Sequence, residues 1–175
     1  MAQFKDDKMN IIERDIDKII ARPMQYISAL GDLGVFHICK EIIDNGWDEC
    51  RKKDSPADKI EVFISDKKII VRDNGRGIPT DIIQKVFETI QAGSNMERAG
   101  GYTAGENGVG TTCAVAMGAE LKAQTIRPNE KKILTLVYQN GRLVERKEEK
   151  YTGKDHGMVV SFSPSKKLMG TDKIP

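Results

Sequence analysis

The side chains of this chain that could do chemistry gather in residues 37–48, HICKEIIDNGWD. At about 100° per residue, this stretch forms a helix with two distinct faces. One face is a narrow polar arc, which consists of His37, Glu41, Asp44, Asn45 and Asp48. Carboxylate and amide oxygens suit Mg²⁺ and water, so the arc is a candidate site for metal-assisted chemistry. The alternative is an ordinary solvated surface, and the helix alone does not decide between the two.

The helix that would position this arc is expected to run from about Leu33 to Arg51, with Asp32 as its N-cap. Its other face is apolar and is expected to enter a core. That face consists of Phe36, Cys39, Ile43, Trp47 and Cys50, with Val35, Ile38 and Ile42 beside them.

Length and composition limit the possible classes of protein. The chain has 175 residues, enough for one domain with a core, and 39% of them are hydrophobic and 31% charged. The net charge of +2 gives no strong attraction to nucleic acid or to a membrane surface. No apolar run approaches the ~20 residues of a membrane span, so no membrane partner is expected. Three cysteines without a CxxC pair indicate reduced thiols in a cytoplasmic protein.

The remaining elements follow from hydrophobic periodicity and turn residues. Residues 1–13 are expected to form an N-terminal arm and residues 14–175 a single domain. Helices are expected over about 11–20, 33–51, 81–91 and 111–118, and strands over about 60–64, 69–72, 120–126, 132–138, 143–149 and 158–163. Thr80 is the expected cap of the third helix, and Asn140-Gly141 predicts a hairpin turn. Because most strands come in hairpins, we expect an α+β fold, a two-layer sandwich whose mixed, mostly antiparallel sheet has helices on one face.

Three further motifs follow the polar helix. DNGRGIP at 73–79 breaks a strand, GGYTAGENGVG at 100–110 is rich in glycine, and a strand follows Gly157. Each has a plain alternative, since DNGRGIP alone could be only a turn and short glycine patterns recur by chance. Their joint order and spacing are what point to one site.

In that order the motifs resemble the GHKL ATPases, with their Bergerat ATP-binding fold, and within them the ATPase region of type IIA DNA topoisomerases such as gyrase B and topoisomerase IV. The resemblance covers about residues 12–165. It is carried by IIERDIDKIIARPMQYI, EIIDNGWDEC, IIVRDNGRGIPTDI, GGYTAGENGVGTT and HGMVVSFSPS.

The resemblance implies ATP and Mg²⁺ as cofactors and a role for each motif. Glu41 would be the general base that takes a proton from the attacking water, with His37 orienting it. Asn45 would be the Mg²⁺ ligand, and Asp73 would accept a hydrogen bond from the adenine amino group. The nucleotide-binding residues implied are Asn45, Asp48, Asp73, Arg76, Gly77, Ile78, Pro79, Gly101, Tyr102, Gly105, Glu106, Asn107, Gly108, Val109, Gly110 and Met158.

The sequence departs from the family pattern at several positions. Met158 stands where the family usually has a threonine near the adenine, and a thioether cannot replace a hydroxyl in a hydrogen-bond network. Asn107 stands where gyrases often have a histidine, and the glycine-rich lid is shorter. These departures suggest a divergent branch of the family.

The function that the resemblance implies is ATP binding and hydrolysis that powers DNA strand passage. Expected partners are DNA and a DNA-cleaving subunit or domain in the full enzyme, a second copy on ATP binding, and aminocoumarin-type inhibitors that contact Arg127. The chain resembles an isolated ATPase domain without the transducer domain, and we expect it to be cytoplasmic, near the nucleoid in a bacterium or in the host cytoplasm for a virus. The alternatives are a MutL-like or chaperone-like ATPase and a nucleotide-binding module that does not hydrolyse.

Overall fold

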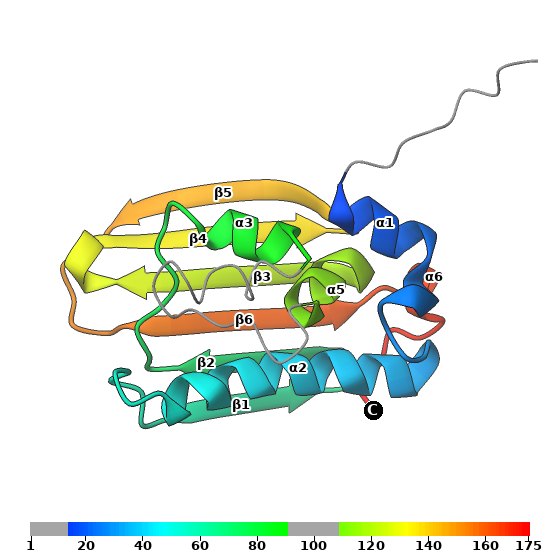
Figure 1. Cartoon of the computed structure of the whole chain (residues 1–175), viewed down its shortest axis with the longest axis horizontal. Helices are drawn as coiled ribbons and strands as arrows, with labels where there is room; N and C mark the ends of the chain where they lie inside the picture. The colour runs from blue at the N-terminus through cyan, green and yellow to red at the C-terminus, as the bar shows by residue number, and fades with distance from the viewer. Residues whose placement is uncertain (1–13, 91–108) are drawn as a thin grey trace, which may run out of the picture.

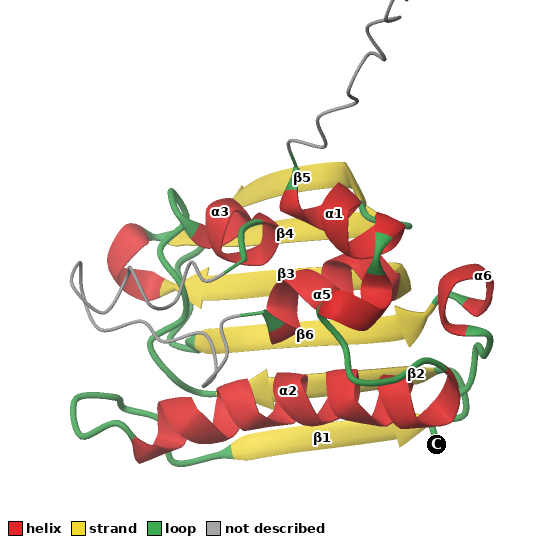
Figure 2. Ribbon diagram, turned by 45° about the vertical axis from the view of Figure 1, so that its right-hand side comes forward, coloured by secondary structure: helices red, strands yellow, loops and turns green. Residues whose placement is uncertain are grey.

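The computed structural model describes residues 14–90 and 109–175, and it has two layers (Figure 1). One layer is a six-stranded sheet in the order β1-β2-β6-β3-β4-β5, and each of its five pairings is antiparallel. The other layer consists of helices on one face of the sheet, with α2 alongside β1 and β2 and α5 in front of β3 and β6 (Figures 1 and 2). The predicted α+β sandwich is therefore confirmed.

All six predicted strands are present. They are β1 Ile60–Ser65, β2 Lys68–Asp73, β3 Gly118–Arg127, β4 Lys132–Gln139, β5 Arg142–Lys150 and β6 Gly157–Pro164. The predicted Asn-Gly turn joins β4 to β5, with φ of 48° at Asn140 and 77° at Gly141. Two successive positive φ angles give a turn whose twist matches that of the flanking strands.

The α-helices within the described residues are α1 Asp15–Ala21, α2 Gly31–Arg51, α3 Ile83–Glu88, α5 Gly110–Met117 and α6 Lys166–Met169. Two 3₁₀ turns, η1 Pro23–Gln25 and η2 Pro128–Glu130, and the short α6 were not predicted. Within the described ranges, no helix has the length and apolar character needed to cross a membrane.

The predicted start of α2 is wrong by two residues. The helix begins at Gly31 with Leu30 in the N-cap position, so Asp32 lies in the first turn and does not cap it. A carboxylate in the first turn still stabilises the helix through the positive end of its dipole. The predicted end at Arg51 is confirmed.

The predicted apolar face of α2 is rotated from the buried one. Phe36 is 52% exposed and Trp47 is 55% exposed, although both were expected in the core. The buried residues are Gly34, Val35, Ile38, Cys39, Ile42 and Gly46. Two glycines on this face allow close packing, since a Cβ on Gly46 would lie 2.8 Å from Ile60 Cδ1.

α3 is shorter than predicted, and its predicted cap is wrong. It begins at Ile83 after Ile82 in the N-cap position. The Thr80 hydroxyl instead donates a hydrogen bond of 2.8 Å to Glu130. The Thr80 hydroxyl, which was expected to cap α3, is therefore bonded to the Glu130 carboxylate outside the helix.

Candidate functional site

A cavity of about 100 Å³ lies between the helices and the sheet. It is lined by Ile42, Asn45, Gly46, Glu49, Lys52, Val71, Asp73, Gly77, Ile78, Val86, Phe87, Thr111, Ala114, Leu121, Met158 and Val160. Five of the nucleotide-binding residues implied by the resemblance are among them: Asn45, Asp73, Gly77, Ile78 and Met158. The polar helix, the 73–79 turn and the late strand thus meet at one site.

Asp73 ends β2 and provides a buried carboxylate in this cavity. It is 7% exposed. One oxygen, Oδ1, accepts hydrogen bonds from the backbone N–H of Gly75 at 2.8 Å and of Met158 at 3.4 Å. Burial raises the pKa of Asp73 to about 6, against the opposing effect of the two backbone N–H groups. The ionised carboxylate is therefore destabilised by burial, and a hydrogen-bond donor that enters the cavity would stabilise it.

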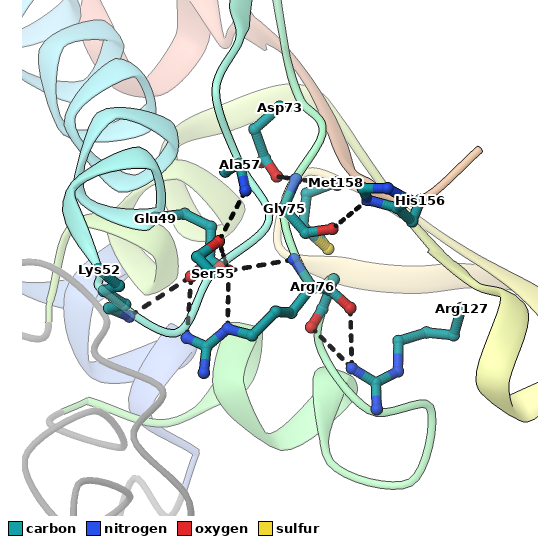
Figure 3. A network of polar contacts seen from close by, with 11 residues as sticks. Glu49, Lys52, Ser55, Ala57, Asp73, Gly75, Arg76, Arg127, His156 and Met158 are labelled. Carbon is teal, nitrogen blue, oxygen red and sulfur yellow. Dashed lines mark hydrogen bonds and ion pairs between the residues drawn. The ribbon is translucent and has the colours of Figure 1, made fainter. Parts of the chain in front are cut away.

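Arg127 fixes the backbone of the 73–79 turn from the end of β3. Its side chain is largely buried, and its Nη1 donates to the carbonyl oxygens of Arg76 at 2.8 Å and Gly77 at 3.1 Å (Figure 3). Its Nε donates to Glu130 at 2.8 Å. The expected contact of Arg127 with inhibitors stays a prediction, and the bonds described here give this side chain a structural role that was not expected.

The neighbouring carbonyls of the turn also accept side-chain hydrogen bonds. His156 Nδ1 lies 2.9 Å from the carbonyl oxygen of Gly75, and because a carbonyl can only accept, Nδ1 carries the proton (Figure 3). Thr125 Oγ1 donates to Ile78 O at 2.8 Å. Gly77 has a φ of +65°, and a Cβ there would lie 2.7 Å from Thr125 Oγ1, so only glycine fits.

Glu49 holds the side chain of Arg76 at the rim of the cavity. Its Oε1 accepts from Arg76 Nε at 2.8 Å and from Arg76 N at 3.0 Å, and its Oε2 accepts from Nη2 at 3.0 Å (Figure 3). Burial raises the pKa of Glu49, but the bonds from Arg76 and Ser55 outweigh it and leave the pKa at about 2. Glu49 was not predicted as a site residue, although it belongs to the EIIDNGWDEC motif. Lys52 Nζ lies 3.6 Å from its Oε2.

The start of α5 meets α2 beside the cavity. Gly110, its first residue, lies so close to Glu41 that a Cβ there would be 2.5 Å from Glu41 Oε2. One turn along α2, Asn45 Nδ2 donates to Thr111 Oγ1 at 3.3 Å. The carboxylate and the amide of the polar arc thus lie next to the N–H groups that begin α5.

The other residues of the polar arc, His37, Asp44 and Asp48, have different surroundings. His37 Nδ1 is hydrogen-bonded to Ser28 Oγ, and Asp44 forms an ion pair with Lys40 one turn earlier on α2. Neither these residues nor Asp48 lie among the residues that line the cavity. Asp44 therefore fits the solvated-surface interpretation, and the site roles of His37 and Asp48 stay predictions.

The glycine-rich stretch is only partly within the described residues. Gly101, Tyr102, Gly105, Glu106, Asn107 and Gly108 lie outside them. Val109 precedes α5 and its carbonyl accepts the N–H of Cys113 at 2.9 Å. Pro79 leads into α3, and its carbonyl accepts the N–H groups of Ile82 and Ile83.

Two other residues at the site have signals that the sequence could have offered. Thr125 follows Leu121 and Ala123 on the inward side of β3, so a polar residue at the next inward position marks a polar spot beneath the helices. Thr111 directly follows the glycine that starts α5. His156 is the first residue of the HGMVVSFSPS motif, whereas Glu130 and Lys52 lie outside every quoted motif.

This chain is similar to a known family of ATPases and to several known proteins. The sequence model of the histidine kinase-, DNA gyrase B- and HSP90-like ATPases matches residues 32–167. The gyrase B protein of Spiroplasma citri is 31% identical over 178 residues, which cover 94% of this chain and 27% of that protein. The corresponding B protein of the type 2 topoisomerase of Aquifex aeolicus is 31% identical, with coverage of 91% and 21%. The chain spans about a quarter of the length of these curated relatives.

A solved structure has the same fold. The 43K ATPase domain of Thermus thermophilus gyrase B, crystallised in complex with an aminocoumarin, matches with a TM-score of 0.72 and 24% identity. The match covers 91% of this chain and 42% of that one. The resemblance inferred from the motifs is confirmed by the family model, which covers most of the chain. The chain belongs to the family of histidine kinase-, DNA gyrase B- and HSP90-like ATPases.

Proposed function

We propose that this chain binds and hydrolyses ATP as the ATPase domain of a type IIA DNA topoisomerase. The observation that carries the proposal is one cavity that combines a buried acceptor, Asp73, with Asn45 and Thr111 beside the start of α5. A purine with an exocyclic amine fits the acceptor, and an anionic phosphate chain fits the helix start. The curated relatives, named as gyrase and topoisomerase subunits, favour this function over a MutL-like or chaperone-like one.

Adenine recognition would depend on Asp73 Oδ2. Because Oδ1 already accepts the N–H groups of Gly75 and Met158, Oδ2 is the oxygen left to accept from the adenine amine. The walls beside it are apolar, including Val71 and Val160. An apolar slot with one oriented acceptor selects a flat base that carries an amino group.

Mg²⁺ would bind through Asn45. No group of three or more His, Cys, Asp or Glu residues that could hold a metal occurs within residues 14–90 and 109–175. Mg²⁺ commonly keeps several waters and takes one or two protein oxygens together with substrate phosphates, so this set of donors fits a nucleotide-borne ion. Asn45 Nδ2 faces Thr111, which turns its Oδ1 to the other side. The ion would neutralise phosphate charge as hydrolysis proceeds.

Glu41 would act as the general base. It lies one turn before Asn45 on α2 and packs against Gly110, so its carboxylate is next to the helix start that would hold the phosphates. A carboxylate there can take a proton from a water aligned with the terminal phosphate. His37 would orient Glu41 or that water from one further turn away.

The partners of the larger protein belong to the same proposal. DNA would be engaged through the full-length enzyme, together with a DNA-cleaving subunit or domain. ATP binding would bring two copies together, and the protein would act in the cytoplasm.

ATP binding is the first test. Titration calorimetry with a non-hydrolysable ATP analogue and Mg²⁺ should give saturable binding to this chain, and GTP should bind more weakly because its base carries a carbonyl in place of the amine. No heat and no competition at millimolar nucleotide would reject the proposed function.

Aminocoumarins should compete with ATP for this site, as a second part of the proposal. Arg127→Ala should weaken the inhibitor more than the nucleotide, although the lost bonds to the Arg76 and Gly77 carbonyls should also weaken ATP somewhat. The measurement is a pair of calorimetric affinities for wild type and variant. Equal losses for the two ligands would mean that Arg127 acts only through the turn.

A further inference from the structure

The connection between β3 and β4 places one carboxylate against the rim of the pocket. This connection is η2, and it is followed by Lys131 with a φ of 53°. Glu130 Oε1 accepts from Arg127 Nε at 2.8 Å. Its Oε2 accepts from the Thr80 hydroxyl at 2.8 Å and from the Thr80 N–H at 3.3 Å. One side chain thus bonds to two residues that lie far apart in the chain.

Both partners of Glu130 control the same short stretch of backbone, residues 76–80, here called the rim segment. Arg127 donates to the carbonyl oxygens of Arg76 and Gly77, at one end of the rim segment. Thr80 is its other end. Gly77 and Ile78, between them, line the cavity. Glu130 therefore secures both ends of the rim segment without lining the cavity itself.

We propose that Glu130 is a positioning residue that sets nucleotide affinity by holding the rim segment in its binding conformation. The inference rests on the proposed function, because it concerns the same pocket. Glu130 belongs to none of the quoted sequence motifs and does not line the cavity, so neither the motifs nor the lining indicates this role.

The burial of Arg127 explains why the carboxylate matters. The Arg127 side chain is 10% exposed and that of Glu130 is 25% exposed. A guanidinium so far from water is stabilised by a counter-charge, and removing Glu130 takes away the carboxylate that bonds to its Nε. Without Glu130, the Arg127 guanidinium is better solvated when it turns toward water. That movement breaks its hydrogen bonds to the carbonyl oxygens of Arg76 and Gly77. The rim segment then loses its bonds at both ends together.

The charge state of Glu130 agrees with this arrangement. Burial raises its pKa, but the bonds from Thr80 and Arg127 outweigh burial and hold the pKa below its usual range. The carboxylate is therefore ionised throughout the neutral range and keeps both partners.

The test compares Glu130→Ala, Glu130→Gln and Thr80→Val with wild type. Nucleotide affinity is measured by calorimetry with a non-hydrolysable ATP analogue, at a temperature where circular dichroism shows each variant to be folded. Glu130→Ala should bind about tenfold more weakly, the loss expected for a buried charge-assisted contact. Glu130→Gln should recover only part of the affinity. Its oxygen can accept from Arg127 and its amide can donate to Thr80 Oγ1, but it carries no counter-charge and its NH₂ group faces the Thr80 N–H. Thr80→Val, which removes one bond and keeps the ion pair, should bind more tightly than Glu130→Ala and more weakly than wild type.

Glu148→Ala is the matched control. Glu148 pairs with Lys132 at 2.7 Å across β4 and β5, so this variant removes an ion pair near η2 but leaves the rim segment untouched. Its affinity should equal that of wild type. In the nucleotide-free proteins, the NMR signals of the Gly75 and Gly77 amides should shift in Glu130→Ala and stay in place in Glu148→Ala.

The outcomes separate this inference from the proposed function. If wild type binds the analogue and folded Glu130→Ala binds equally well, the positioning role is rejected while the ATPase assignment stands. If wild type itself binds no nucleotide, the proposed function fails, and the glycine amide signals still show whether Glu130 holds the rim segment. If Glu130→Ala does not fold, Thr80→Val decides, and wild-type affinity in that variant rejects the inference.

Discussion

Replacing Glu41 by Gln should reduce the rate of ATP hydrolysis by about 10²–10⁴-fold, the usual contribution of a positioned general base. The nucleotide affinity should change little, because Gln has nearly the same shape and fits the same space beside Gly110. The reason for the loss is that an amide cannot accept the proton of the attacking water. Turnover should be measured by phosphate release in wild type and in the variant.

Asp44→Asn is the control for this substitution. Asp44 lies on the same helix, less than one turn further along, but it pairs with Lys40 on the exposed side of the helix. Neutralising it should leave turnover unchanged within about twofold, since exposed ion pairs contribute little. Equal turnover in wild type and Glu41→Gln would assign the base to another residue.

The strands were predictable because their signals are local. Ile60, Val62 and Ile64 recur at every second position and mark β1, and the Asn140-Gly141 pair fixes the β4–β5 turn with φ angles that few other residues adopt. Such patterns depend on residues within a few positions of one another. The structure therefore reproduced all six strands with small changes at their ends.

The orientation of α2 was not predictable in the same way. Hydrophobicity placed Phe36 and Trp47 inside, whereas the buried face runs through Gly34 and Gly46. A glycine adds nothing to an apolar pattern, yet it marks where another element comes closest. A Cβ on Gly34 would lie 2.2 Å from Ala29 O, so no larger residue fits there without movement.

The residues of the candidate site were likewise predictable where their signals are local, and not where they depend on long-range contacts. Asp73 and Asn45 could be identified because they stand in compact motifs. The bonds that hold the rim segment join residues far apart, such as Glu130 and Thr80 at a separation of 50 positions. No spacing rule relates such pairs, and only the folded sheet brings them together.

Asp73→Asn is expected to have opposite effects on nucleotide binding and on stability. Binding of ATP should weaken by about 1–3 kcal/mol, because a charge-assisted bond to the adenine amine is lost. The amide oxygen would take the place of Oδ1, which accepts from Gly75 and Met158. The NH₂ group would then point where the adenine amine must come, so that two donors face each other.

The stability effect follows from the raised pKa of Asp73. Its pKa is about 6 in the folded protein and about 3.9 in an unfolded chain, so the folded state binds the proton more tightly. The stabilising contribution of the protonated form is complete below about pH 4 and is lost as pH rises through about 6. At about 1.4 kcal/mol per pKa unit, the ionised carboxylate costs the nucleotide-free protein about 3 kcal/mol at pH 8.

Asparagine stays neutral at every pH, so the variant should be more stable than wild type at pH 8 and equally stable near pH 4. Thermal unfolding without nucleotide, measured across this range, tests the sign. Asp81→Asn, at an exposed position, should show no such difference. In wild type, ATP affinity should fall as pH decreases through about 6, because the protonated carboxyl no longer accepts from the amine through a charged oxygen. If Asp73→Asn instead lowers stability at pH 8, a native partner stabilises the ionised carboxylate. The burial of Asp73 would then not destabilise the nucleotide-free protein.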